Sequence, residues 1–262
     1  MNFKNRIYIV TGAAGNLASQ FVNTLNKQGS IVYALDTNIK KLNQINSLRD
    51  KKYSINVTNF SVDVTNENQV KTFFKKVKKL DGIINAAAIN PKIDNSKSNY
   101  SKFINYSLKD WDLSLRVCLN GTFLMSKHAC KIFEKKMLGN IINISSTYGI
   151  VSPDQRVYTN EKFTNRLYKP LDYSTSKHGI IGFTKSLAAY YHNTKIRINC
   201  LSPGGVEENQ SNEFKKNYSA KTIIGRMSKK NEYESAILFM LSDDTSYMTG
   251  SNLVIDGGWT SI

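Results

Sequence analysis

The chain has 262 residues, of which 40% are hydrophobic, and this is enough for one α/β domain with a single buried core. Its formal charge of +16 comes from lysines spread along the chain, which favours a solvated surface over attraction of an anionic substrate, and both over nucleic-acid binding. The sequence has no run of about 20 apolar residues, no signal-peptide pattern and no disulfide-type or metal-type spacing among its three cysteines, so it predicts a cytoplasmic protein without a membrane span or a metal site.

Short runs rich in β-branched residues alternate with amphipathic stretches, and this alternation predicts repeated βαβ units around a parallel sheet. The expected strands lie at 6–10, 30–35, 59–64, 81–86, 140–145, 196–201 and 252–256. The expected helices lie near 16–28, 38–49, 66–79, 110–137, 173–192 and 229–242. Polar segments without a clear period, which we expect to be loops, are 87–108, 150–171 and 204–226. No repeat or linker divides the chain, so we predict one doubly wound α/β domain over 1–262, with about seven parallel strands and helices on both faces.

The first expected strand ends in a glycine-rich turn, TGAAGNLA at 11–18, that leads into the first expected helix. Glycine permits a tight strand-to-helix turn, and the N-terminus of the following helix attracts a phosphate. An ordinary turn of small residues is the alternative, but the position in the first βαβ unit favours a Rossmann-type dinucleotide site. The cofactor-binding residues expected here are Gly12, Gly15, Asn16 and Leu17.

The second expected strand is followed by Asp36, about 20 residues beyond the glycines. A carboxylate at this place accepts hydrogen bonds from the adenosine ribose and repels a 2′-phosphate, so the sequence favours NAD over NADP. Lys40 and Lys41 lie nearby and would soften that repulsion, and a plain surface aspartate is a further alternative.

A second pattern supplies acid–base groups. The expected strand 140–145 runs into two serines, Ser145 and Ser146, and a YSTSK motif begins at Tyr173. A spacing of four places Tyr173 and Lys177 one turn apart on the same face of a helix. A lysine ammonium beside a phenol stabilises the phenolate, which then exchanges a proton with an alcohol or a carbonyl. A serine hydroxyl at the strand end is placed to hold the same oxygen.

Together these motifs resemble those of the classical short-chain dehydrogenases/reductases over essentially the whole chain. The motifs that carry the resemblance are TGAAGNLA (11–18), Asp36, VDV (62–64), NAAA (85–88), INISS (142–146), YSTSK (173–177), SPGG (202–205) and YMTGSNLVIDGG (247–258). The resemblance implies an NAD(P)-dependent oxidoreductase with Tyr173 as the acid/base. It further implies that Lys177 binds the nicotinamide ribose and tunes the tyrosine, and that Ser146, by its distance from Gly149, orients the reacting oxygen. The cofactor residues that it adds are Asp63 and Val64 at the adenine, Asn85, Ala86 and Ala87 on the adenosine side, and Pro203, Gly204 and Val206 at the nicotinamide end.

The resemblance also implies a homo-oligomer, a dimer or a tetramer, built on the helices near 110–137 and 173–192 and on the last strand. Trp259 and Ile262 in the tail are apolar and would prefer a partner chain to water. The other expected partner is a small-molecule substrate.

Two motifs depart from the family pattern. Asn16 and Ala18 stand where the last two glycines of the turn normally fall, and with Gly15 the turn resembles that of extended short-chain enzymes that dehydrate or epimerise nucleotide sugars. Cys118 stands where the family has a helix-borne asparagine that supports a bound water in the proton relay. Either Asn120 or another group takes its place, or the relay is weakened.

The catalytic serine and tyrosine are 27 positions apart (146 to 173), more than in the family, which predicts an inserted loop at about 152–170 beside the catalytic residues. Arg156 can bind a phosphate or a carboxylate and Gln155 can bond sugar hydroxyls, so with Tyr148 they are candidate substrate residues. An oligomer contact or an ordinary surface loop is the alternative. The insertion and the C-terminal motifs are similar to those of short-chain enzymes of bacterial surface-sugar pathways, including flagellin modification and legionaminic-type sugars, and of gluconate 5-dehydrogenase-like enzymes.

We therefore predict interconversion of a secondary alcohol and a ketone on a polar, sugar-like and anionic substrate, with NAD as the cofactor. A non-catalytic NAD-binding scaffold is one alternative, suggested by Cys118, and nucleotide-sugar dehydratase or epimerase chemistry is another.

Overall fold

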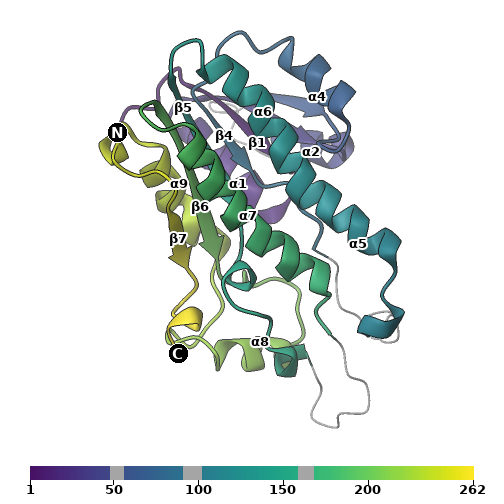
Figure 1. Ribbon diagram of the computed structural model, residues 1–262. Coiled ribbons are helices and arrows are strands. Elements are labelled where there is room, and N and C mark those ends of the chain that lie inside the picture. Colours follow the sequence, from purple (N-terminus) through teal and green to yellow (C-terminus); the bar gives the residue numbers. More distant parts are fainter. Residues whose placement is uncertain (48–55, 91–101, 159–167) are drawn as a thin grey trace.

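One parallel sheet of seven strands forms the centre of the protein (Figure 1). The structure is a computed structural model in which residues 1–47, 56–90, 102–158 and 168–262 are described. The strand order is β3-β2-β1-β4-β5-β6-β7. The strands are β1 Ile7–Thr11, β2 Ile31–Asp36, β3 Val57–Ser61, β4 Gly82–Asn85, β5 Leu138–Ile144, β6 Lys195–Pro203 and β7 Asn252–Ile255. The expected doubly wound α/β fold is confirmed, and each expected strand lies within a few residues of its place.

The direction in which strands are added reverses between β1 and β4. The chain passes from β1 to β2 and β3 on one side, then returns and places β4 on the other side of β1. Such a switch leaves a crevice at the carboxyl ends of the two central strands, where nucleotides bind in open α/β sheets. The glycine-rich turn follows β1 and the segment 86–90 follows β4, so both lie at this crevice.

Helices cover both faces of the sheet (Figure 1). One face is covered by α1 Asn16–Lys27, α2 Ile39–Ser47 and α9 Glu234–Leu241. The other is covered by α4 Glu67–Phe74, α6 Gly121–Phe133 and α7 Leu171–Tyr190. Two further helices are α5 Leu108–Leu115, which leads into α6, and α8 Asn212–Ser219, which lies beyond the carboxyl ends of the strands. None of the helices in the described ranges is both long and apolar enough for a membrane span.

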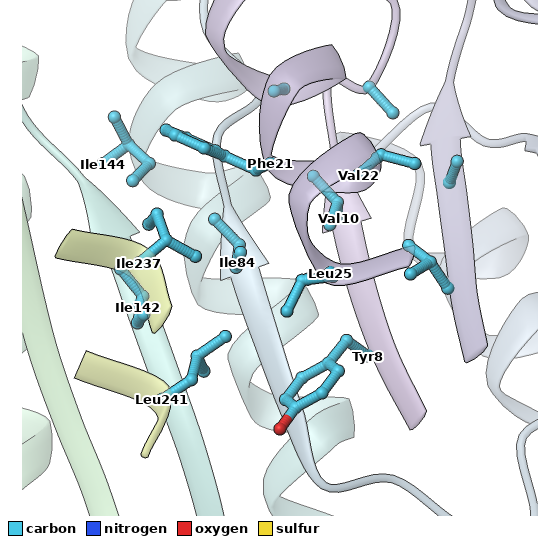
Figure 2. Close-up of a cluster of buried hydrophobic side chains, with 14 of the residues drawn as sticks. Tyr8, Val10, Phe21, Val22, Leu25, Ile84, Ile142, Ile144, Ile237 and Leu241 are labelled. Carbon is cyan, nitrogen blue, oxygen red and sulfur yellow. The ribbon is translucent and has the colours of Figure 1, made fainter. Parts of the chain in front are cut away.

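Strand β1 illustrates why both faces are buried. Successive side chains of a strand point to opposite faces, so Tyr8 and Val10 pack under α1 and α9 while Ile9 packs under α4 and α6. Figure 2 shows the first of these clusters, in which Phe21 of α1 and Ile237 of α9 meet the strand residues. Each such side chain contributes about 1.5–3 kcal/mol when it is fully buried. The strands therefore appear in the sequence as nearly continuous apolar runs.

The helix expected over 110–137 is interrupted, because a π-helical turn, Arg116–Asn120, joins α5 to α6. Gly121 follows this turn against the chain beyond β3, where a Cβ atom would lie 2.6 Å from Val64 Cγ2. The helix thus approaches that segment at a point where only glycine fits. Turns of this type often occur at functional sites.

The expectation that 204–226 is a loop is wrong in part, because this segment contains α8. Ser211 caps the helix, its Oγ accepting a hydrogen bond from Phe214 N at 3.2 Å, and Tyr218 is buried. The helix has only two turns and a mostly polar sequence, so no repeating apolar period marks it.

Candidate active site

Gly12 brings the ends of β1 and β4 together. Its φ is +65°, and a Cβ atom there would lie 2.8 Å from Ala87 Cα, so the position requires glycine. The neighbouring Thr11 Oγ1 accepts hydrogen bonds from Ala86 N at 3.0 Å and Ala87 N at 3.1 Å. The expected cofactor residues of the two strands therefore form one packed edge of the crevice.

The start of α1 is open to an anion. Gly15 is the N-cap, no side chain caps the helix there, and Gly15 and Asn16 are exposed. The N–H of Gly15 donates to Gly12 O at 2.8 Å, which closes the turn and leaves the first N–H groups of the helix at the surface. Leu17 is half-buried against the core and Ala18 is buried, which explains why glycine is not needed at position 18. This geometry suits a pyrophosphate.

Asp36 is fixed beside the turn. Its Oδ2 accepts a hydrogen bond from Ala14 N at 3.0 Å and its Oδ1 accepts one from Asn38 N at 2.8 Å. The side chain is therefore part of the crevice and not a plain surface aspartate. Lys41 lines a hollow of about 620 Å³ together with Asn16 of the glycine-rich turn and with Glu207, Glu208, Asn209, Lys229 and Lys230.

The residues expected around the adenosine lie at the same edge. Asp63 Oδ1 accepts hydrogen bonds from Thr65 N and Thr65 Oγ1, both at 2.8 Å, and the next residue, Val64, is buried. Asn85 donates from Nδ2 to Ser126 Oγ at 3.0 Å and to Asn143 Oδ1 at 2.9 Å. The amide nitrogen of Asn85 is therefore used inside the protein, and a cofactor contact through it is not available.

Tyr173 and Lys177 occupy one face of the first turns of α7. Lys177 is buried, its Nζ lies 5.7 Å from the centre of the Tyr173 ring, and it donates to Ile144 O at 2.8 Å. The end of β5 thus holds the ammonium next to the tyrosine. Tyr173 is half-buried, which leaves its ring accessible from the crevice.

The two serines after β5 have different environments. Ser145 Oγ donates to Lys177 O at 2.8 Å and would lie 2.1 Å from a Cβ at Gly149, so it ties β5 to α7. Ser146 Oγ accepts from Tyr148 N at 3.2 Å and keeps its own proton to donate. The geometry therefore favours Ser146 for a bond to a substrate oxygen.

The expected nicotinamide end closes this side of the crevice. Thr147 Oγ1 donates to Pro203 O at 3.3 Å, which places the end of β6 beside the residues after β5. Gly204 packs on β7, where a Cβ would lie 2.9 Å from Asp256 Cα, and Val206 forms a bridge with Ser228. The cofactor residues expected from the sequence thus lie either at the last residue of a strand, as Asp36, Asn85 and Pro203 do, or on segments that follow the carboxyl ends of the strands.

Comparisons with known proteins agree with this geometry. A family model described as Enoyl-(Acyl carrier protein) reductase matches residues 12–260. The chain belongs to the short-chain dehydrogenase/reductase family. It is 28% identical to post-translational flagellin modification protein A of Campylobacter coli, over 98% of each chain. It is also 28% identical to the 3-oxoacyl-[acyl-carrier-protein] reductase of Aquifex aeolicus, again over 98% of each. A crystal structure of a short-chain dehydrogenase from Leptospira borgpetersenii with bound NAD+ matches with a TM-score of 0.85 and 32% identity, over 99% of this chain and 94% of that one.

As a short-chain dehydrogenase/reductase the protein is an oxidoreductase. The structure shows where Cys118, which replaces the asparagine of the family pattern, lies. Cys118 is buried in the π-helical turn, its carbonyl oxygen accepting from Thr122 Oγ1 at 2.7 Å. Asn120 is exposed on the same turn. Asn120 therefore does not replace the family's asparagine, and the bend in the helix forms without that side chain.

A cluster of mostly buried aromatic residues packs beside Tyr173. Tyr158 OH donates to Tyr148 OH at 3.0 Å, and the ring of Trp259 packs 4.5 Å from that of Tyr218. Burial raises the pKa of all three tyrosines well above the usual range, so they stay protonated at neutral pH. Tyr173 packs against this cluster, which also contains Val157, Phe214 and Met227.

The expectation that Trp259 needs a partner chain to cover it is wrong. Trp259 is only 7% exposed and packs on Tyr148 and Tyr218 of its own chain, whereas Ile262 is exposed. The sequence did not indicate this packing because one of the partners of the indole, Tyr218, comes from α8, a helix that was not expected.

The guanidinium of Arg156 is paired with a carboxylate of its own segment. Its side chain is 79% exposed, and its Nε and Nη2 donate to the two carboxylate oxygens of Asp154, at 2.8 and 2.7 Å. Gln155 is bonded to the main chain of Lys169 in both directions, its Nε2 to Lys169 O at 3.2 Å and its Oε1 from Lys169 N at 2.8 Å. Asp154 thus pairs with the guanidinium of Arg156, and Gln155 connects the two ends of the insertion. Residues 159–167 of the insertion lie outside the described part of the chain.

The structure adds a residue that the sequence did not single out. Lys169 is only 6% exposed, and its Nζ lies 4.3 Å from the centre of the Tyr173 ring and donates to Asn90 Oδ1. Burial lowers the pKa of Lys169 to about 8; Asp172 raises it and Lys177 lowers it further. In the sequence it stands in a polar loop before a proline, where lysines are usually solvated, so no signal marked it.

Asp172, next to Tyr173, is completely buried and accepts a hydrogen bond on Oδ1 from Tyr106 OH at 2.9 Å. This bond connects the segment before α5 to the start of α7. It holds the first turn of α7, and with it Tyr173, in place.

Proposed function

We propose that this short-chain dehydrogenase/reductase interconverts a secondary alcohol and a ketone on a polar, sugar-like substrate, with NAD as its cofactor and Tyr173 as the acid/base. The observation that carries the proposal is that Tyr173 and Lys177 lie together on α7, and that Lys177 is bonded to the end of β5, the strand that Ser146 follows. The open N-terminus of α1 and the close packing at Gly12 fit a dinucleotide.

In the oxidative direction the phenolate of Tyr173 accepts the proton of the alcohol, and the ammonium of Lys177 balances the charge that the phenolate carries. Ser146 donates a hydrogen bond to the same oxygen and keeps it in line with the phenolate. A nicotinamide bound at the crevice would supply the acceptor for the hydride that the alcohol carbon must lose to become a ketone. In the reductive direction Tyr173 returns its proton to the oxygen.

The preference for NAD over NADP rests on Asp36, whose carboxylate is fixed where the adenosine ribose would lie. The Leptospira relative, reported with NAD+, supports the same choice. Titration of both cofactors by nicotinamide fluorescence tests it, and tighter binding of the phosphorylated form would contradict it.

A sugar-like substrate is supported by two observations. The half-buried rings of Tyr158 and Phe214, at the edge of the aromatic cluster on which Tyr173 packs, offer apolar faces of the kind that pack on sugar rings. The flagellin modification relative is matched over nearly the full chain. Screening of aldonic acids, sugar phosphates and nucleotide sugars for NADH formation identifies the class, and activity on acyl thioesters alone would favour the role of the Aquifex relative.

The decisive experiment is Tyr173→Phe. We expect turnover to be lost while NAD affinity stays nearly unchanged, because the ring is kept and only the proton-transferring oxygen is removed. Equal turnover in the variant and the wild type would refute the mechanism. Absence of turnover in both, with NAD bound, would favour a non-catalytic scaffold.

We also propose that the protein is a homo-oligomer. Large apolar side chains are exposed before and along the α5–α6 pair, namely Phe103 (76%), Ile104 (87%), Leu108 (72%) and Phe123 (49%). Apolar patches of this kind favour a partner surface. A monomeric mass by light scattering at micromolar concentration would contradict the proposal.

A further inference from the structure

Lys169 is held at a fixed point beside the reactive tyrosine. Its main-chain N–H and C=O are both bonded to the side chain of Gln155, at 2.8 and 3.2 Å, and Pro170 and α7 follow directly. The lysine is therefore part of the base of the insertion, one turn before Tyr173.

The ammonium of Lys169 is enclosed. Nζ is bonded to Asn90 Oδ1, from the segment after β4, and lies 4.3 Å above the Tyr173 ring. It stands at the same crevice as Lys177, whose Nζ is 5.7 Å from that ring. Within the described ranges no carboxylate forms an ion pair with it, although Asp172 is near enough to act electrostatically.

An ammonium group has three N–H donors, and a buried one that is bonded to a neutral amide oxygen and a ring face can still bind an anion that neutralises its charge. The other positive groups of the insertion region do not compete for that role. Arg156 and Lys221 are both paired with Asp154, and Lys177 donates to the main chain of β5. Of these four groups, Lys169 is the one whose charged nitrogen is bonded to neither a carboxylate nor a main-chain carbonyl among the described residues.

We propose that Lys169 binds a carboxylate of the substrate, so that the enzyme acts on a hydroxy acid or oxo acid whose acid group lies close to the reacting carbon. This inference rests on the proposed role of Tyr173 at the reacting carbon. A carboxylate is favoured over a phosphate because a single ammonium with one donor already in use matches one negative charge, whereas a phosphate needs several donors. The substrate class narrows accordingly from polar sugars to sugar acids and related acids.

Binding can be tested without knowledge of the substrate and without turnover. The probe is sodium acetate, with acetamide as its neutral isostere, added to the enzyme saturated with NAD. The readout is the rise in the thermal unfolding midpoint, which reports affinity for the folded state. Lys169→Met is the test variant and Arg156→Ala is its matched control, because both lose one positive charge from the same region and respond equally to non-specific salt effects.

We expect acetate to stabilise the wild type and Arg156→Ala alike, with an affinity at least about 10-fold weaker in Lys169→Met, the loss typical of a charged hydrogen bond. Acetamide should give no such difference. Lys169→Gln, which keeps a partner for Asn90, replaces Lys169→Met if the latter does not fold. Equal acetate responses in the wild type and the Lys169 variant would overturn the proposal, as would a Lys169-dependent response to phosphate but not to acetate.

Failure of this proposal is distinguishable from failure of the proposed function. Tyr173→Phe keeps the ring under Lys169, so it should bind acetate like the wild type. Acetate binding that depends on Lys169, together with undiminished turnover in Tyr173→Phe, would leave the anion site standing and remove the acid/base assignment. The reverse pattern would remove only the anion site.

Discussion

Replacement of Lys169 by methionine should make the protein more stable at neutral pH. The pKa of Lys169 falls from 10.5 to about 8 through burial, a change of about 2.5 units. At 1.36 kcal/mol for each unit, the charged form is disfavoured in the folded state by about 3 kcal/mol. Loss of the bond to Asn90 and of the contact with the Tyr173 ring offsets about 1–2 kcal/mol of this. We expect a net gain of about 1–2 kcal/mol in the free energy of unfolding.

The gain should depend on pH in a defined direction. Because the pKa of Lys169 is lower in the folded state, the unfolded chain holds more protons between about pH 8 and pH 10.5. Wild-type stability therefore rises with pH across this window, and the advantage of Lys169→Met shrinks. Below about pH 8 both states are protonated, and the cost of the buried charge is fully present.

Urea unfolding at about pH 7 and about pH 9.5 measures both effects, with Arg156→Ala as a surface control that should change the free energy of unfolding by no more than about 0.5 kcal/mol. A Lys169→Met protein that is less stable at neutral pH would refute the reasoning. So would a stability difference that stays constant between the two pH values. Either result would mean that the ammonium is well solvated or well paired in the folded protein.

Three further predictions follow from the contacts described above. Gly12→Ala should lower NAD affinity by more than about 10-fold and stability by at least about 1–2 kcal/mol, because the position has φ +65° and no room for Cβ. Nicotinamide fluorescence measures the affinity and urea unfolding measures the stability, with Gly182→Ala, where Cβ meets nothing within 4 Å, as the control. Asp36→Ala should weaken NAD binding about 10-fold and reduce the preference over NADP, and an unchanged ratio of the two dissociation constants would count against the assigned role of the carboxylate. Tyr106→Phe should cost about 1.5–3 kcal/mol by chemical denaturation, since it removes a hydrogen bond from the buried carboxylate of Asp172, and a neutral effect would show that water replaces the phenol.

The sequence was sufficient for the sheet and for the cofactor edge because their signals are local. Strands buried on both faces appear as apolar runs, and the glycine turn and the Tyr173–Lys177 spacing each lie within a few residues. Positions such as Gly12 are defined by backbone geometry that only glycine tolerates, so the residue type itself carries the information.

The substrate side could not be predicted in the same way, because its contacts join distant segments. Arg156 was expected to reach the substrate, yet an aspartate two residues away satisfies its guanidinium. Lys169 is recognisable only when Asn90 and Tyr173 are seen around it. Trp259 looked like an interface residue because the helix that supplies Tyr218 has no clear period. Short helices and buried charges depend on tertiary contacts that a linear pattern does not contain.

The two hydrogen bonds between Gln155 and Lys169 fix the start of α7, the helix that carries Tyr173, independently of the insertion that precedes it. One amide side chain satisfies both main-chain groups of Lys169, as a neighbouring strand would, and so closes the loop at its base. The entropy of loop closure grows only slowly with length, so residues can be added or removed between 158 and 168 at small cost while α7 keeps its starting point. The length of this segment can thus change during evolution without moving α7 or Tyr173, and Gln155 is the residue on which that independence depends.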